Sequence, residues 1–252
     1  MNRMKIIKLT LAVQLISTTI YSQQPTAKEI VKKAYDLTQG QTNESYMRMS
    51  IVRPTWQRTI AFHSWAKGRD LSLVIVTDPA KEKGQTFLKR KNEIWNWVPT
   101  IQRMIKLPPS MMSQGWMGSD FTNDDLLKAA SIVEDYDQTL LGSETCNEMD
   151  CYKIKLIPKP NAAIVWGSLI KWISKKGFLQ MKTEFYDEDN QLVKTESASN
   201  VKNMGDRDIP THFEIIPFDK PGNKTIVDLD KVSFNKTMED EFFSQQNMKI
   251  IR

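Results

Sequence analysis

Cysteine and histidine are scarce in this chain of 252 residues, which contains two of each. Thiolates and imidazoles are the main zinc ligands, and imidazole is the most frequent general base. A zinc site or a histidine-based catalytic centre therefore has little to be built from. Ten glycines and eleven prolines are too few for a collagen-like or low-complexity chain. The composition, 40% hydrophobic and 26% charged, is that of a globular protein.

The short motifs of several enzyme classes are also missing. The sequence has no GxSxG nucleophile elbow, Walker loop, HExxH helix or GxGxxG loop. His63 and His212 lack a partner pattern, so we interpret each as a structural or surface residue. The acidic groups 187–189 and 239–241 fit a hairpin turn and a helix start, although carboxylates can also pair in space for glycoside hydrolysis. We predict that the chain is not an enzyme and has no cofactor or metal site.

No apolar run reaches the roughly 20 residues that a transmembrane helix needs. The first 22 residues instead read as a secretory signal peptide, with basic residues at Arg3, Lys5 and Lys8, an apolar stretch over 9–20, and a small residue, Ser22, before the cut. The alternative is an amphipathic first helix. No cysteine lies near the cut, which excludes a lipoprotein anchor. We therefore expect an exported chain whose residues 23–252 form one domain.

The positive charge of the chain belongs largely to this leader. Removing its three basic residues lowers the formal net charge from +5 to +2. No dense stripe of lysine and arginine is left, so we do not expect nucleic acid as a partner.

Cys146 and Cys151 flank four residues between two strand-like runs. In an exported protein this spacing predicts a disulfide that closes a hairpin. For so small a loop it would contribute roughly 2 kcal/mol. The alternative is a redox pair, although such pairs usually have CxxC spacing at a helix start.

One amphipathic helix is predicted at the start of the mature chain. Thr26 and Glu29 have the spacing of a capping box, and Gly40 provides the stop. Between them apolar residues recur at helical spacing, at Ile30, Ala34 and Leu37.

After this helix the apolar period changes to two, which indicates strands. The alternating runs lie at 47–51, 60–63, 71–75, 152–156, 179–185 and 225–230. Turn signals separate them at 67–68, 189–190 and 221–223. We count roughly ten strands with short links. The fold class is mainly β (α+β): a single strongly curved antiparallel sheet, or incomplete β-barrel, closed by short helices.

Residues 108–131 interrupt the strand pattern. Pro108 and Pro109 end the preceding strand, and Thr122 or Asn123 can cap a short helix that runs to Ala130. An apolar segment inserted between strands needs a surface to cover, so we interpret this one as a flap over one opening of the sheet.

Large, soft apolar side chains are in excess. The mature chain keeps all seven tryptophans and all but two of the thirteen methionines. Methionine adapts to flexible ligands, and tryptophan lines apolar pockets. Ordinary core packing is the alternative for each residue. The residues predicted to line a ligand-binding cavity and its flap are Met47, Met49, Trp95, Trp97, Met104, Met111, Met112, Trp116, Phe121 and Trp166.

Residues 95–127, WNWVPTIQRMIKLPPSMMSQGWMGSDFTNDDLL, resemble the signature of outer-membrane lipoprotein-sorting proteins of the LolA/LolB-like superfamily, in its longer, exporter-associated branch. That signature has a tryptophan-rich strand, a basic strand, a methionine/serine segment, a Gly-Ser-Asp-Phe run and an acidic helix start. CYKIKLIPKP at 151–160, IPTHFEI at 209–215, the strand at 222–235 and DEFFS at 240–244 are further matches.

The resemblance implies a curved incomplete barrel with a hydrophobic cavity for acyl chains. It also implies a non-catalytic periplasmic carrier that moves lipoproteins or lipids toward the outer membrane. Its partners would be an acylated lipoprotein or lipid, an inner-membrane exporter and an outer-membrane acceptor. Two alternatives stay open: an adaptor of an exporter without lipid cargo, and a hydrolase acting on envelope lipid or glycan.

Overall fold

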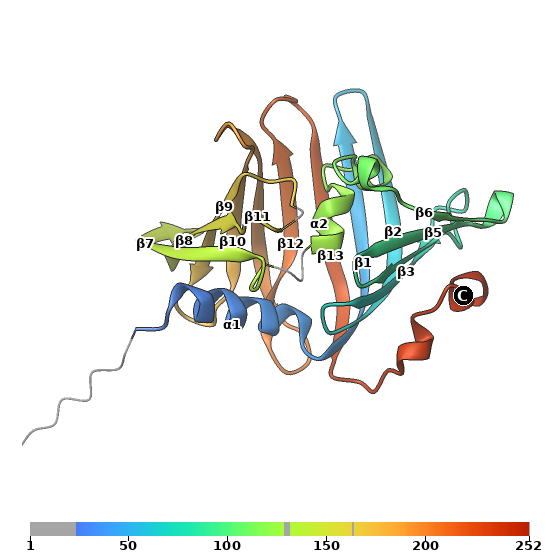
Figure 1. Ribbon diagram of the computed structural model, residues 1–252, viewed down its shortest axis with the longest axis horizontal. Coiled ribbons are helices and arrows are strands. Elements are labelled where there is room, and N and C mark those ends of the chain that lie inside the picture. The colour runs from blue at the N-terminus through green and yellow to red at the C-terminus, as the bar shows by residue number, and fades with distance from the viewer. Residues whose placement is uncertain (1–23, 129–131, 163, 252) are drawn as a thin grey trace, which may run out of the picture.

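A computed structural model describes residues 24–128, 132–162 and 164–251 (Figure 1). The predicted signal peptide at 1–22 and the predicted helix residue Ala130 lie outside the described residues.

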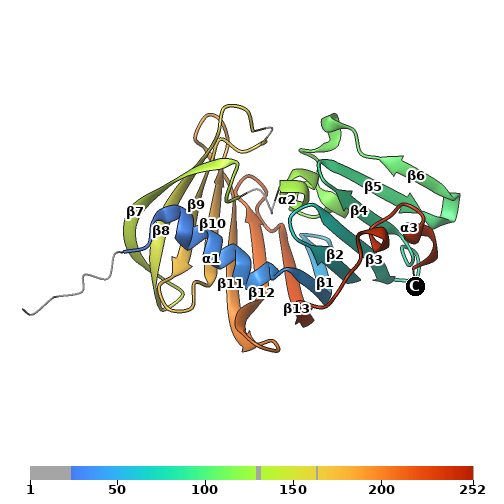
Figure 2. The same cartoon turned by 60° about the horizontal axis from the view of Figure 1, so that its bottom comes forward.

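The described residues form one antiparallel sheet of thirteen strands, in the order β6-β5-β4-β3-β2-β1-β13-β12-β11-β10-β9-β8-β7. The strands are β1 Thr42–Arg53, β2 Trp56–Lys67, β3 Leu71–Asp78, β4 Thr86–Arg90, β5 Glu93–Val98, β6 Arg103–Lys106, β7 Tyr136–Cys146, β8 Met149–Pro158, β9 Ser168–Ser174, β10 Gln180–Tyr186, β11 Leu192–Asn203, β12 Asp208–Pro217 and β13 Lys224–Phe234. Strands that are consecutive in the sequence pair with each other, apart from β6 and β7, and β1 also pairs with β13. This single long-range pairing joins two wings, β1–β6 and β7–β13 (Figure 2).

The predicted fold class is confirmed, and the described residues contain thirteen strands rather than roughly ten. The sheet is curved but open, because β6 and β7 are its two edges and do not pair with each other. The described strands therefore do not form a closed antiparallel β-barrel. The chain between these edges instead forms the flap described below.

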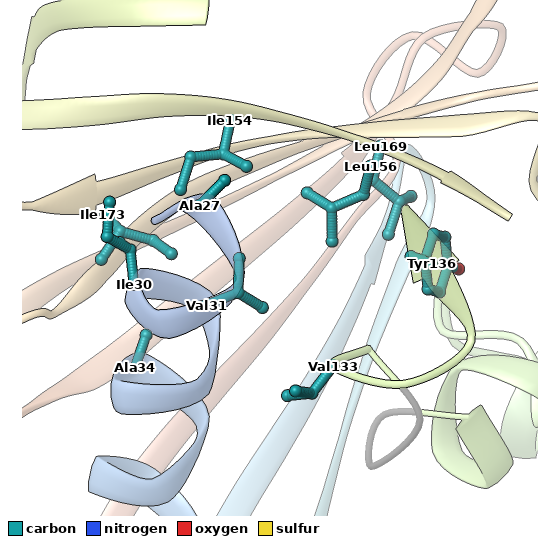
Figure 3. Close-up of a cluster of buried hydrophobic side chains, with 10 residues drawn as sticks. All are labelled: Ala27, Ile30, Val31, Ala34, Val133, Tyr136, Ile154, Leu156, Leu169 and Ile173. Atoms are coloured by element: carbon teal, nitrogen blue, oxygen red, sulfur yellow. The ribbon is translucent and has the colours of Figure 1, made fainter. Parts of the chain in front are cut away.

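Helix α1 (Ala27–Gln39) forms where the sequence predicts it. The Thr26 hydroxyl accepts a bond from the Glu29 N–H, and the Glu29 carboxylate accepts one from the Thr26 N–H, which is a complete capping box. Gly40, with φ of 63°, ends the helix. The buried stripe of α1 packs on β7–β9 (Figure 3), with Ala27, Ile30, Val31 and Ala34 facing Tyr136, Ile154, Leu156, Leu169 and Ile173.

The segment between β6 and β7 covers the first wing, β1–β6. It contains the 3₁₀ turns Pro109–Met111 and Trp116–Gly118 and helix α2 (Asn123–Lys128). We call residues 107–128 the flap, and the face of the sheet that α1 and the flap cover the inner face. Trp116, 9% exposed, packs between Phe62 and Phe87, with ring centroids 5.1 and 5.2 Å apart.

The chain after β13 covers the outer face of the first wing. It includes the 3₁₀ turn Asp240–Phe242 and helix α3 (Asn247–Ile250). Phe243 is fully buried with Leu73, Leu88 and Met248. A further 3₁₀ turn, Pro99–Ile101, links β5 to β6. No helix in the described ranges has both the length and the apolar character needed to cross a membrane.

The predicted Cys146–Cys151 disulfide is wrong for this structure, in which both thiols are free and buried. The β7–β8 register pairs Cys146 with Met149 and Cys151 with Glu144. The cysteines are therefore diagonal neighbours, typically about 7–8 Å apart, rather than direct partners. That separation exceeds the usual Cα spacing of a disulfide. Burial raises the pKa of the Cys151 thiol to about 11.

Candidate binding cavity

A cavity of about 320 Å³ lies between α1, the flap and the inner face of β9–β12. Apolar and aromatic side chains form most of its wall: Val31, Ala34, Tyr35, Phe121, Leu126, Ile132, Tyr136, Trp166, Leu169, Ile173, Phe185, Pro210 and Phe213. They reach the cavity because the stripe of α1 and the inward positions of these strands face each other.

A second cavity of about 290 Å³ lies beside the first, toward β1–β3. Met47, Val74, Val227, Leu229 and Val232 are among its lining residues. The two cavities share Thr38, Gln39, Pro210 and Phe213. They therefore adjoin one another at the C-terminal end of α1, across the junction of the two wings.

A row of polar side chains crosses the inner face inside the first cavity. Lys171 on β9 is the register partner of Thr183 on β10, and Thr183 is the partner of Glu196 on β11. The adjacent row holds Leu169, Phe185 and Lys194 on the same three strands. The sheet register thus places two lysines and one glutamate on the inner face, and Asp124 and Asp125 of α2 add two further carboxylates to the cavity wall.

Lys171 is 7% exposed, and its ammonium donates to Gln180 Oε1 at 2.6 Å and to Thr183 Oγ1 at 3.1 Å. Gln180 Nε2 in turn donates to Glu196 Oε1 at 3.1 Å. Burial in the apolar wall lowers the pKa of Lys171 to about 8, against the opposing attraction of Glu196 and Asp125. The ammonium is still the major form at pH 7.

Lys194 has a different environment. Its ammonium lies 2.5 Å from Asp125 Oδ2 on α2 and donates to the Asp120 carbonyl at 2.9 Å. Trp166 Nε1 donates to the other oxygen of the Asp125 carboxylate. The Lys194 ammonium also lies over the Trp166 ring, at 4.8 Å. These contacts hold α2 against the sheet.

A second set of bonds fastens the flap at Asp120. Its carboxylate forms a buried ion pair with Arg53 at 3.1 Å and accepts a bond from the Thr225 hydroxyl at 2.7 Å. Arg53 also donates to the Gly118 carbonyl, and Arg58 donates to the Met117 carbonyl. The flap is held by charge-assisted bonds at its centre as well as by Trp116 packing.

Three of the ten predicted cavity residues lie in the cavity walls. Phe121 and Trp166 line the first cavity, and Met47 lines the second. The other seven lie elsewhere. Met49 and Trp116 belong to the core between the flap and β1–β3. Met111 and Met112 are half-buried in the flap. Their roles in binding a ligand stay predictions.

Trp95, Trp97 and Met104 pack on the outer face with the C-terminal segment. Trp95 and Trp97 are register partners of Leu88 and Thr86 on β4. The ammonium of Lys249 lies over the Trp97 ring, at 5.5 Å. Period two places both tryptophans on one face, but it does not say which face becomes the inner one.

Sequence reasoning missed the polar row. One signal was available in β9, SLIKWIS, where Lys171 occupies an inward position between Leu169 and Ile173. A lysine at an apolar position of a buried strand is unusual. His63 and His212 instead form pairs with Glu44 at 2.9 Å and Asp228 at 2.7 Å, and neither histidine is among the lining residues of the two cavities.

Solved structures share this fold. The structure of a DUF1329 family protein from Desulfovibrio piger matches with a TM-score of 0.80 and 21% identity, over 88% of this chain and 97% of that chain. The structure of a putative outer membrane lipoprotein-sorting protein domain from Vibrio parahaemolyticus matches with a TM-score of 0.78 and 21% identity, over 88% of this chain and 98% of that chain. The structure of a LolA superfamily protein from Nitrosomonas europaea matches with a TM-score of 0.76 and 24% identity, over 88% of this chain and 99% of that chain.

No curated protein matches the chain. A family model whose description is that of an uncharacterized protein matches residues 68–250, which is more than half of the chain. The chain therefore belongs to this family of uncharacterized proteins, and its fold is that of the LolA-like superfamily, as the sequence resemblance implied.

Proposed function

We propose that this protein is a non-catalytic periplasmic carrier of apolar chains. It is exported by a signal peptide at residues 1–22, and residues 23–252 act as one carrier domain. It binds the acyl chains of lipids or lipoproteins in the two adjoining cavities and moves them toward the outer membrane. An inner-membrane exporter would deliver the cargo, and an outer-membrane acceptor would receive it.

The apolar cavity under α1 and the flap is the observation that carries this proposal. Its volume of about 320 Å³, with about 290 Å³ more next to it, is in the range of small-molecule sites. Transfer of an acyl chain from water into such a wall contributes about 0.8 kcal/mol per CH₂. Binding therefore needs no covalent chemistry.

The fold comparisons support the same function. One of the three similar structures is described as a putative outer membrane lipoprotein-sorting protein domain, and another as a LolA superfamily protein. Loading and release would require the flap to open, which needs two states of similar free energy. The Asp120 and Lys194 contacts would have to break in the open state.

An adaptor without lipid cargo is the competing function. Such a protein has no need of an interior space, and its tryptophans would fill the core. Trp116 does fill the core between the flap and the first wing, but the second wing keeps the cavity beside Trp166. The space favours the carrier.

Native mass spectrometry of the mature protein, purified from periplasm without detergent, tests the proposal. We expect a stoichiometric adduct that extracts into organic solvent as a phospholipid or an acylated peptide. A clean apo mass, with no later uptake of a fluorescent fatty acid, would contradict the carrier function and favour the adaptor.

A further inference from the structure

We propose that Lys171 binds an anionic group of the cargo, so that the cavity selects apolar chains that end in, or lie next to, a carboxylate or a phosphate. This inference rests on the proposed carrier function and adds to it the charge of the polar end of the cargo.

Lys171 has hydrogen-bonding capacity to spare. An ammonium group has three N–H donors. In the part of the chain that the structure describes, two acceptors meet the Lys171 ammonium, Gln180 Oε1 and Thr183 Oγ1. Both acceptors are uncharged, so a third donor is left for a ligand in the cavity.

The ammonium also lacks an ion-pair partner within 4 Å among the described residues. The nearest carboxylate along the polar row, Glu196, is bonded to the amide of Gln180, which lies between the two charges. Asp125, the other carboxylate that acts on Lys171, is already paired with Lys194. A buried cation with only neutral partners costs free energy, and an anionic ligand would offset that cost.

Lys194 provides an internal comparison. Both lysines are buried on the inner face, with Lys194 4% exposed. Asp125 neutralises Lys194, whose remaining contacts fasten α2 and the flap. Of these two inner-face lysines, Lys171 is the one oriented for a ligand, since it is among the residues that line the cavity.

The site fits a small anion attached to an apolar chain. Leu169 and Ile173 flank Lys171 on β9, and Phe185 lies next to Thr183 on the same face. An acyl chain can contact these side chains while its carboxylate or phosphate oxygens accept from the ammonium. A charge-assisted bond of this kind is stronger than a neutral one.

The test compares ligands that share one chain. Dissociation constants for oleic acid and oleyl alcohol are measured at pH 7 by displacement of a fluorescent acyl probe from the full mature chain. The variants are Lys171→Met and Lys182→Met. Lys182 lies on the outer face of β10, over the Trp172 ring and bonded to Glu184, and is the matched control.

We expect the wild type and Lys182→Met to bind the acid about tenfold or more tightly than the alcohol. Lys171→Met should bind both ligands with the affinity that the wild type has for the alcohol. Retained alcohol binding shows that the variant is folded. Equal affinities of the wild type for the acid and the alcohol would overturn the inference while leaving the carrier function intact. A preference for the acid that survives in Lys171→Met would do the same. Binding of neither ligand would overturn both.

Two further measurements sharpen the result. Glu196→Gln removes the carboxylate at the far side of Gln180 and should strengthen oleate binding without changing alcohol binding. Oleoyl lysophosphatidic acid, compared with oleate, distinguishes the two sources of negative charge. The ligand whose affinity falls more in Lys171→Met identifies the anionic group that the cavity selects.

Discussion

At the scale of single residues, Lys171 combines a cost to stability with a place in the cavity wall. Its pKa of about 8 in the folded chain lies below the ordinary value of 10.5 because burial disfavours the charged form. The unfolded chain therefore binds more protons between these two values, and stability contributed at this position rises with pH across that window.

We accordingly expect the free energy of unfolding of the wild type, relative to Lys171→Met, to increase as the pH rises from about 8 to 10.5. The charged groups around Lys171 are Glu196, Asp124 and Asp125, which line the same cavity, and Lys194, which is paired with Asp125. Urea unfolding of the ligand-free proteins at several pH values measures the difference. A difference that does not change between pH 8 and 10.5 would contradict a lowered pKa.

Phe213 tests the binding cavity itself, because it lines both cavities from β12. We expect Phe213→Asp to abolish binding of an acyl probe, since a carboxylate in the shared wall would have to be desolvated next to the chain. Ile216→Asp is the control, since Ile216 is 44% exposed and lies on the opposite face of the same strand. Titration of both folded variants with the acyl probe measures their affinities. Unchanged binding in Phe213→Asp would move the ligand out of these cavities.

At the scale of elements, the flap is attached through few but strong contacts. The Arg53–Asp120 pair is buried, with side chains 13% and 6% exposed, and Thr225 bonds the same carboxylate. Removing one partner of a buried pair leaves an uncompensated charge, which costs about 3–5 kcal/mol.

Asp120→Ala should therefore loosen the flap before it loosens the sheet. We expect faster hydrogen exchange over residues 107–128 than in the wild type, with little change in β8–β11. Asp230→Ala is the matched control, because its pair with Arg48 lies on the surface and is worth about 0–1 kcal/mol. Uniform acceleration across the whole chain would show that Asp120 supports the fold rather than the flap.

At the scale of the molecule, the sheet has two wings that are joined by one strand pair, β1–β13. The inner face carries the cavities in the second wing and across the junction, whereas the C-terminal segment packs on the outer face of the first wing. Stability of the outer-face cluster around Phe243 and ligand binding on the inner face should thus be separable.

Phe243→Ala tests this separation. Phe243 is fully buried with Leu73 and Leu88, and truncation of such a side chain costs about 3–5 kcal/mol. We expect a lower midpoint of urea unfolding, together with acyl-probe affinity close to that of the wild type. A parallel loss of affinity in the folded variant would mean that the outer face and the cavities are coupled.

Local rules determined much of this structure from the sequence alone. The capping box at Thr26 and Glu29 and the stop at Gly40 set the ends of α1. Alternation of apolar residues located six of the thirteen strands in the described residues, and turn residues such as Gly68 separate some of them. These features depend on contacts between residues a few positions apart, and such contacts are readable in one chain.

The tertiary structure decided what the apolar period of the strands and the spacing of the cysteines leave open. Alternation puts Trp95 and Trp97 on one face, but the C-terminal segment that packs there made it the outer face. Cysteine spacing suggested a bridge, but the β7–β8 register made the two residues diagonal neighbours. The polar row needed three strands in register to place Lys171, Thr183 and Glu196 side by side. Register and face are set by long-range packing, so the cavity and its buried cation follow from the folded chain and not from any one segment.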